Sequence, residues 1–179
     1  MKNTFLALNF FPLSVAGLLA VAFHPALQAQ TLVTCPLGVS QITYSPGLTN
    51  TPQMVYYEGI EMSGPCVAAT NPELISFTST FSGYALLSCT NFSASPLLGD
   101  QIFTWNTGGT SEWHYDTVGT TTVGGTTVLL VEGPISSGVL EGAQVEQVVS
   151  HVNPNALLCS TPVGVSTVTG PSAYVFLSL

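Results

Sequence analysis

The chain has 179 residues, a hydrophobic content of 46% and a formal net charge of −8 at pH 7. Lys2 is its single Lys or Arg, against nine Asp and Glu residues. Nucleic-acid binding needs Lys or Arg to displace counterions from phosphates, and attraction to an anionic membrane surface needs the same side chains. The composition therefore excludes both partners. Without cations to compensate buried charge, we expect the carboxylates mostly at the surface.

The first 29 residues have the layout of a cleaved signal peptide. Lys2 precedes an apolar run from about Phe5 to Phe23, and a small-residue cleavage site ends at Ala29. A retained membrane anchor is one alternative, and lipidation of Cys35 in the segment LVTC is another. We expect 1–29 to be a signal peptide and 30–179 a single secreted domain, since about 150 residues suffice for one core.

Four cysteines follow the expected signal: Cys35, Cys66, Cys89 and Cys159. An even number in an exported chain predicts two disulfides, and four cysteines allow three pairings. We favour Cys66 with Cys89 and Cys35 with Cys159, which nests a short loop inside one that joins the chain's ends. No C-x-x-C motif is present, so a structural role is favoured over a redox role.

From residue 30 onward, short segments rich in Val, Ile, Thr, Tyr and Phe alternate with Gly, Pro and Asn, and none keeps the apolar spacing of an amphipathic helix. The expected strands are 38–44, 53–62, 74–81, 84–89, 101–105, 111–118, 126–132, 139–149, 156–160 and 172–179. So many short strands predict an all-β fold, an antiparallel β-sandwich of about 8 to 10 strands or, alternatively, a closed β-barrel. Short strands and loops argue against a third architecture, an outer-membrane barrel.

The segment SEWHYD, residues 111–116, alternates polar and aromatic side chains. In a strand, Glu112, His114 and Asp116 share one face and the aromatic side chains share the other. The three polar residues are the candidate metal ligands, although alternate residues on a strand lie roughly 7 Å apart and a tight site normally recruits another strand. The alternative is a purely structural role, in which the polar side chains form an exposed row and the aromatic side chains are buried on the other face. No cofactor is expected.

Four aromatic residues are candidates for stacking on a sugar: Trp105, Trp113, Tyr56 and Tyr57. A hairpin of 101–105 with 111–116 would put Trp105 and Trp113 on one face together with Phe103, which favours burial of both tryptophans. Tyr56 and Tyr57 are adjacent, so one ring faces each side of their strand.

Paired carboxylates are the candidate machinery for an enzyme. Glu112 and Asp116 could act as acid and base on a glycosidic bond. Glu58 and Glu61 point to opposite faces of a strand and form a poorer pair. No local signature of a Ser-His-Asp triad is present. No residue is therefore assigned as catalytic.

Five segments, in order along the chain, carry a resemblance: ITYSPGLTNTPQ (42–53), SGPC (63–66), FTWNTGGTS (103–111), GPISSGVLEG (133–142) and GVSTVTG (164–170). They resemble a loosely defined family of small secreted bacterial proteins, commonest among actinobacteria, whose function is uncharacterised. The resemblance implies an exported, all-β, disulfide-bearing domain and brings no active site with it.

Together these features lead us to expect a secreted or cell-surface β-domain without catalysis. Its role would be structural, adhesive or weakly carbohydrate-binding, and its partner an extracellular glycan or a second copy of the chain. The alternative is a small secreted glycan hydrolase that uses paired carboxylates.

Overall fold

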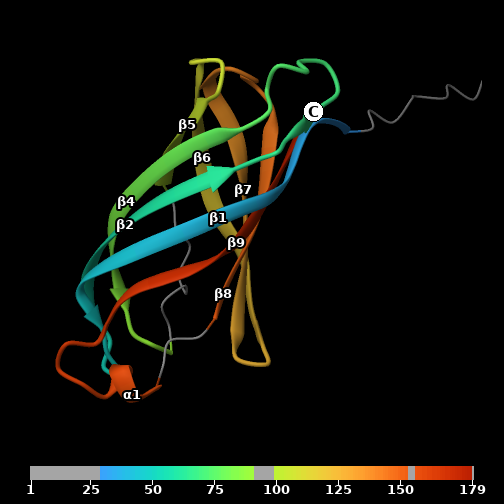
Figure 1. Ribbon diagram of the computed structural model, residues 1–179. Helices are drawn as coiled ribbons and strands as arrows, with labels where there is room; N and C mark the ends of the chain where they lie inside the picture. The colour runs from blue at the N-terminus through green and yellow to red at the C-terminus, as the bar shows by residue number, and fades with distance from the viewer. Residues whose placement is uncertain (1–28, 91–98, 153–155, 179) are drawn as a thin grey trace, which may run out of the picture.

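The structure, a computed structural model, describes residues 29–90, 99–152 and 156–178, and the side chains of 116–118 lie outside this description. Its strands are β1 (Gln30–Leu48), β2 (Gln53–Ser63), β3 (Val67–Ala68), β4 (Phe77–Leu87), β5 (Gly99–Trp105), β6 (Thr110–Val123), β7 (Thr126–Gly138), β8 (Gln144–Val152) and β9 (Val165–Ser178). Among the described residues the one helix is α1 (Ala156–Cys159), below the strands in Figure 1. The expected all-β fold is confirmed. The segment 1–28, most of the expected signal peptide, lies outside the described residues.

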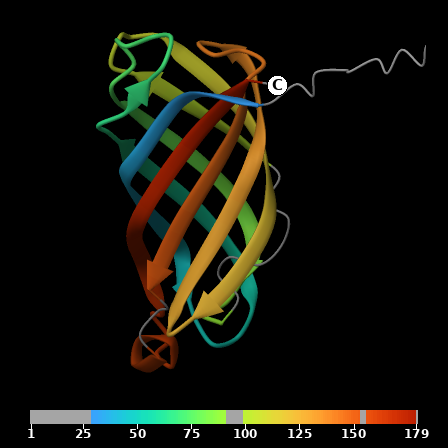
Figure 2. The same cartoon turned by 90° about the vertical axis from the view of Figure 1, so that its right-hand side faces the viewer.

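Eight of the strands form a closed antiparallel barrel (Figure 1 and Figure 2). Around the barrel the order is β1, β2, β4, β5, β6, β7, β8 and β9, while β3 adds a short pairing to β1. The long β1 closes the ring because it pairs with β2 on one side and with β9 on the other. This corrects the expected sandwich in favour of its barrel alternative. Closure gives each of the eight strands a neighbour on both sides, although among the described residues β4 beyond Thr80 pairs with β2 alone.

Two segments differ from their predicted structure for local reasons. The predicted strands 74–81 and 84–89 overlap one continuous strand, β4, which stays paired with β2 through Gly83. The glycine at this position leaves room for the Tyr57 hydroxyl, which a side chain would meet. The predicted strand 156–160 is instead α1, in which the Ala156 carbonyl accepts from Ser160 Oγ at 3.0 Å and the Leu158 carbonyl accepts from Thr161 Oγ1 at 2.7 Å. Across the described ranges, no helix has the length and apolar character needed to cross a membrane.

The barrel interior holds two apolar clusters. The larger, called the aromatic cluster below, lies toward the end that carries Cys35 and Cys66 and includes Phe77, Phe103, Trp105, Trp113, Tyr115, Tyr174 and Phe176. Phe103 stacks on Trp113 with ring centroids 5.6 Å apart, and Phe77 meets Trp105 edge-on at 5.2 Å. The smaller cluster surrounds Tyr44, Leu48, Val55, Tyr57, Leu87, Cys89 and Cys159. The predicted burial of the aromatic face of 101–105 and 111–116 is therefore confirmed.

One disulfide lies at each end of the barrel, and both differ from the favoured pairing. Cys35 pairs with Cys66, and Cys89 pairs with Cys159. The 11-residue β4 separates Cys66 from Cys89, and at about 3.3 Å per residue it spans on the order of 35 Å, whereas a disulfide needs Cα atoms within about 7 Å. Cys159 lies just past the far end of β1, where its carbonyl accepts from Asn50 N at 3.1 Å, so Cys35 cannot reach it.

Candidate functional site

The four aromatic candidates occupy different environments. Trp105 and Trp113 are 2% and 0% exposed inside the aromatic cluster. Tyr57 also points inward and is buried, while Tyr56 lies on the outer side of β2. Neither tryptophan therefore presents a ring to a surface ligand, and Tyr56 is the candidate with outward access.

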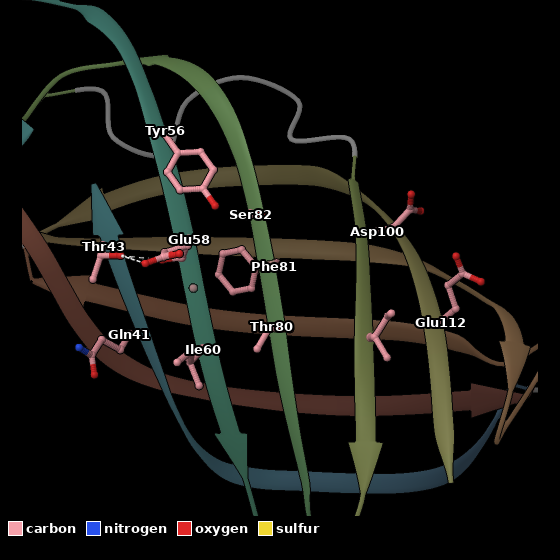
Figure 3. Close-up of a pocket in the computed structure, with 12 residues that line it drawn as sticks. Gln41, Thr43, Tyr56, Glu58, Ile60, Thr80, Phe81, Ser82, Asp100 and Glu112 are labelled. Atoms are coloured by element: carbon pink, nitrogen blue, oxygen red, sulfur yellow. Dashed lines mark hydrogen bonds between the residues drawn. The ribbon is translucent and has the colours of Figure 1, made fainter. Parts of the chain in front are cut away.

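Tyr56 lines a shallow hollow of about 500 Å³, called the trough below, on the outer faces of β1, β2, β4, β5 and β6 (Figure 3). Closure of the barrel builds its floor by placing outward residues of five strands in one cross-strand row. In order, these partners are Gln41, Ile60, Thr80, Ile102 and Glu112. The remaining lining residues are Thr43, Glu58, Gly59, Phe81, Ser82 and Asp100.

Three carboxylates border the trough, and each is held by a neighbour on the next strand. Glu58 Oε1 accepts a hydrogen bond from Thr43 Oγ1 at 3.3 Å on one side of the trough. On the other side, beyond Phe81 in Figure 3, lie Asp100 and Glu112. Asp100 Oδ1 is 2.7 Å from the Nδ1 atom of His114, and Glu112 Oε2 accepts from Ser137 Oγ at 3.1 Å. The trough thus combines fixed acceptor oxygens with apolar surface.

Two of the three candidate metal ligands turn to different partners. His114 turns to Asp100, its cross-strand partner, and Glu112 turns to the hydroxyl of Ser137. The side chain of Asp116 lies outside the described residues, although its backbone pairs with Glu132. Within the part of the chain that the structure describes, no group of three His, Cys, Asp or Glu residues could hold a metal ion. Glu112 and His114 thus belong to two separate surface pairs.

A buried polar group, called the polar centre below, lies inside the barrel next to the aromatic cluster. Glu61 is 1% exposed there. Gln101 Nε2 donates to Glu61 Oε2 at 3.0 Å and to Ser79 Oγ at 2.6 Å. Gln147 Nε2 donates to Glu61 Oε1 at 2.7 Å and contacts the Tyr174 hydroxyl at the same distance. Both carboxyl oxygens are therefore held by side-chain amides from β5 and β8.

Burial dominates the protonation of Glu61. Removal from water disfavours the charged form and raises the pKa of Glu61 to about 7, against hydrogen bonds from Gln101 and Gln147 that lower it. The carboxyl is therefore about half protonated near neutral pH. The expectation that carboxylates lie mostly at the surface does not hold for Glu61, because neutral amides and a raised pKa replace a cationic partner.

A small cavity of about 60 Å³ adjoins the polar centre. Its walls include Glu61, Phe81 and His151. His151 is 1% exposed, and burial lowers its pKa to about 4, so the imidazole is neutral at pH 7. The hydroxyls of Tyr57 and Tyr115 share a hydrogen bond at another wall, and burial raises the pKa of both phenols.

Alternation along β2 accounts for one inward glutamate. Glu58 and Glu61 are three residues apart in a strand and must face opposite sides. Glu58 shares its face with Tyr56, and Glu61 shares its face with Tyr57, so one of the two glutamates had to point inward. By alternation Gln101 shares the inner face of Phe103, but its contact with Glu61, like that of Gln147, carries no sequence signal, because only barrel closure brings these distant strands to the same carboxyl.

A second outer hollow, of about 900 Å³, lies near the Cys35–Cys66 end. Exposed apolar side chains of Leu37, Met62 and Ile75 line it, and its lining has no charged residue. It therefore offers fewer groups for orienting a polar ligand than the trough.

No protein-family model matches the chain, and comparison with curated proteins and with solved structures finds no match either.

Proposed function

We propose that the protein is an exported, non-catalytic binding module that holds a neutral glycan in the trough. The observation that carries the proposal is the trough itself, where outward aromatic and apolar groups lie among fixed carboxylate and hydroxyl oxygens. A sugar presents an apolar C–H face and a rim of hydroxyl groups. It needs this combination of flat apolar surface and hydrogen-bond acceptors.

The aromatic part of the surface extends beyond the trough. Tyr84, 73% exposed, packs against Tyr56 with ring centroids 5.1 Å apart and an angle of 52° between the planes. The two residues are cross-strand partners on β2 and β4. Their contact supports a platform on which a sugar ring can stack.

The charge of the trough favours a ligand without negative charge. Glu58, Asp100 and Glu112 border it, and the only Lys or Arg in the sequence is Lys2. A phosphorylated, sulfated or carboxylated ligand would be repelled, since a field of one sign repels ligands of the same sign. A neutral glycan can donate its hydroxyl groups to these carboxylates.

Binding without hydrolysis fits the openness of the trough. A glycosidase keeps one of its two carboxyls protonated by placing it in a desolvated site. Asp100 is 63% exposed, and His114 beside it is 56% exposed. A hydrolase that uses these carboxylates is therefore the weaker candidate.

Export is part of the proposal. The two disulfides indicate folding in an oxidising environment. Together with the signal-like segment 1–29, they support a secreted or cell-envelope location.

A glycan array followed by calorimetry with the best neutral hit tests the proposal. Tyr56→Ala should weaken binding roughly tenfold, whereas Tyr56→Phe, which keeps the ring, should bind nearly as well. Glu112→Gln should weaken binding by a similar factor, since a hydrogen bond to a charged group contributes on the order of 1.5 to 3 kcal/mol. The matched control is Glu141→Gln, an exposed acid in the β7–β8 turn. Absence of any glycan hit, or equal effects of Glu112→Gln and Glu141→Gln, would reject the trough as a glycan site.

A further inference from the structure

Among the described residues, the buried carboxyl of Glu61 has no counterion. The ionisable side chains that face it are Tyr57 on its own strand, Tyr115 on β6, His151 on β8 and, through Gln147, Tyr174 on β9. Phenols carry no positive charge in either protonation state, and the His151 imidazole is neutral at pH 7. The chain's only Lys or Arg is Lys2, outside the described residues. A carboxylate in this position therefore needs either a proton or a cation from outside the chain.

The cavity beside Glu61 has the size and oxygen donors to receive a small cation. Its volume of about 60 Å³ is roughly twice the 30 Å³ that one water occupies in the liquid, enough for an aminomethyl head group but not for an aromatic ring. The hydroxyl of Ser40, 1% exposed, lines it and faces the carboxyl without good hydrogen-bond geometry. An ammonium group has three donors to place, and the carboxyl, this hydroxyl and the phenols are acceptors.

Phe81 is the wall between this cavity and the trough. Its ring lines both hollows. It lies over Gly59, where an added side chain would overlap the ring, so it rests on bare backbone. The ladder between β4 and β5 runs from Phe77 to Thr80 and stops one residue before Phe81. Figure 3 shows the ring between Glu58 and Asp100. A rotation of this one side chain would join the two hollows.

We propose that Glu61 and the adjoining cavity form an internal site for the ammonium group of a small primary amine, which enters from the trough past Phe81. The rest of the amine would lie in the trough against Ile60 and Ile102. The carboxylates of Glu58, Asp100 and Glu112 at the entrance raise the local concentration of a cation. This site goes beyond the proposed glycan binding and uses the trough only as its entrance.

Proton linkage gives the site a signature. An ammonium group stabilises the carboxylate form of Glu61, so binding displaces the proton that the carboxyl holds near neutral pH. Affinity should therefore rise from about pH 6 to about pH 8, with a proton released on binding at the lower pH. His151 stays neutral across this range and adds no opposing change.

Calorimetry with phenethylamine as the probe tests the site, with phenethyl alcohol as the neutral control of the same shape. Wild type should bind the amine and not the alcohol. Glu61→Gln should lower amine affinity roughly tenfold or more, because it removes the charge that pairs with the ammonium group, while Glu141→Gln should leave it unchanged. In a kinetic binding measurement, Phe81→Trp should slow the association of phenethylamine and Phe81→Ala should speed it, because the side chain at this position blocks the way from the trough to Glu61.

A measurement on wild type keeps the test independent of whether Glu61→Gln folds. The ¹³C resonance of the Glu61 carboxyl should move when phenethylamine is added. An unmoved resonance, equal binding of amine and alcohol, or unchanged amine affinity in folded Glu61→Gln would overturn the proposal. Glycan binding by the same Glu61→Gln protein is expected to be unchanged, so failure of the amine site and failure of the glycan site are distinguishable.

Discussion

The aromatic cluster and the polar centre share one barrel interior but are built differently. Tyr174 belongs to both: its ring meets Phe77 edge-on with centroids 5.0 Å apart, and its hydroxyl contacts Gln147 Nε2 at 2.7 Å. On one side of this residue the interior is filled with rings. On the other side Glu61 is desolvated without a cation, which disfavours its ionised form. The first region stabilises the fold, whereas the second costs stability at neutral pH and supplies a titratable group.

The largest effect is expected in the aromatic cluster. Trp113→Ala should lower the free energy of unfolding by about 3 to 5 kcal/mol, because it leaves a cavity among rings. It also removes the hydrogen bond from Trp113 Nε1 to the Gly133 carbonyl at 3.0 Å. Urea denaturation measures the change. Val123→Ala, at a 69% exposed position, is the control and should stay within about 0.5 kcal/mol. A loss near that of the control would refute the packing account.

Loss of a disulfide should have the second-largest effect on the free energy of unfolding. Replacing Cys35 and Cys66 by Ser should lower the free energy of unfolding by roughly 2 to 4 kcal/mol, and replacing Cys89 and Cys159 should cost somewhat more. The reason is loop length, since the sequence separations are 31 and 70 residues. Denaturation of both double variants, compared with reduced wild type, checks this order. Peptide mapping that finds Cys66 joined to Cys89 would contradict the pairing itself.

The polar centre should make the free energy of unfolding depend on pH. The folded protein holds the Glu61 proton up to about pH 7, whereas in the unfolded chain the group has its ordinary pKa of 4.5. Between these values the folded state binds more protons, so wild type loses stability as the pH rises. Relative to Glu61→Gln, wild type should lose about 2 kcal/mol between pH 5 and pH 7.5. His151 contributes the opposite slope to both proteins and cancels in the difference.

The comparison of unfolding free energies across pH decides this prediction. A constant difference between wild type and Glu61→Gln from pH 5 to pH 7.5 would mean that Glu61 titrates like an exposed glutamate.

The smallest effect is expected outside the barrel. Asp100 and His114 form a pair with both side chains more than half exposed, and such pairs contribute at most about 1 kcal/mol. Asp100→Asn should therefore change the free energy of unfolding by less than this. Thermal unfolding in low and high salt measures it. A loss as large as that of Trp113→Ala would mean that the outer pair supports the fold.

The sequence predicted what depends on alternation along one strand. The shared face of Phe103, Trp105, Trp113 and Tyr115 followed from the two-residue period and the hairpin between them, and the structure confirms their burial. Alternation has the same form in a sandwich and in a barrel, so it could not choose between these architectures. The helix at 156–159 was missed because its carbonyls are satisfied by nearby hydroxyls that a strand pattern does not reveal.

The features that depend on closure of the barrel were not predicted from the sequence. Cys66 and Cys89 are the two cysteines closest to each other in sequence, yet β4 carries them to opposite ends of the barrel. The trough needs outward residues of five strands, and the polar centre needs amides from β5 and β8. The sequence predicted carboxylates mostly at the surface because no cation is present to compensate a buried charge, and it did not single out Glu61 as an exception. A raised pKa and neutral amide donors take the place of that cation.

The most direct test of this account is a ¹³C NMR titration of the Glu61 carboxyl in the full-length protein without ligand. We predict a midpoint near pH 7 for this carboxyl. A midpoint near the ordinary value of 4.5 would show that water or a cation reaches the carboxyl in the resting protein and would contradict the account.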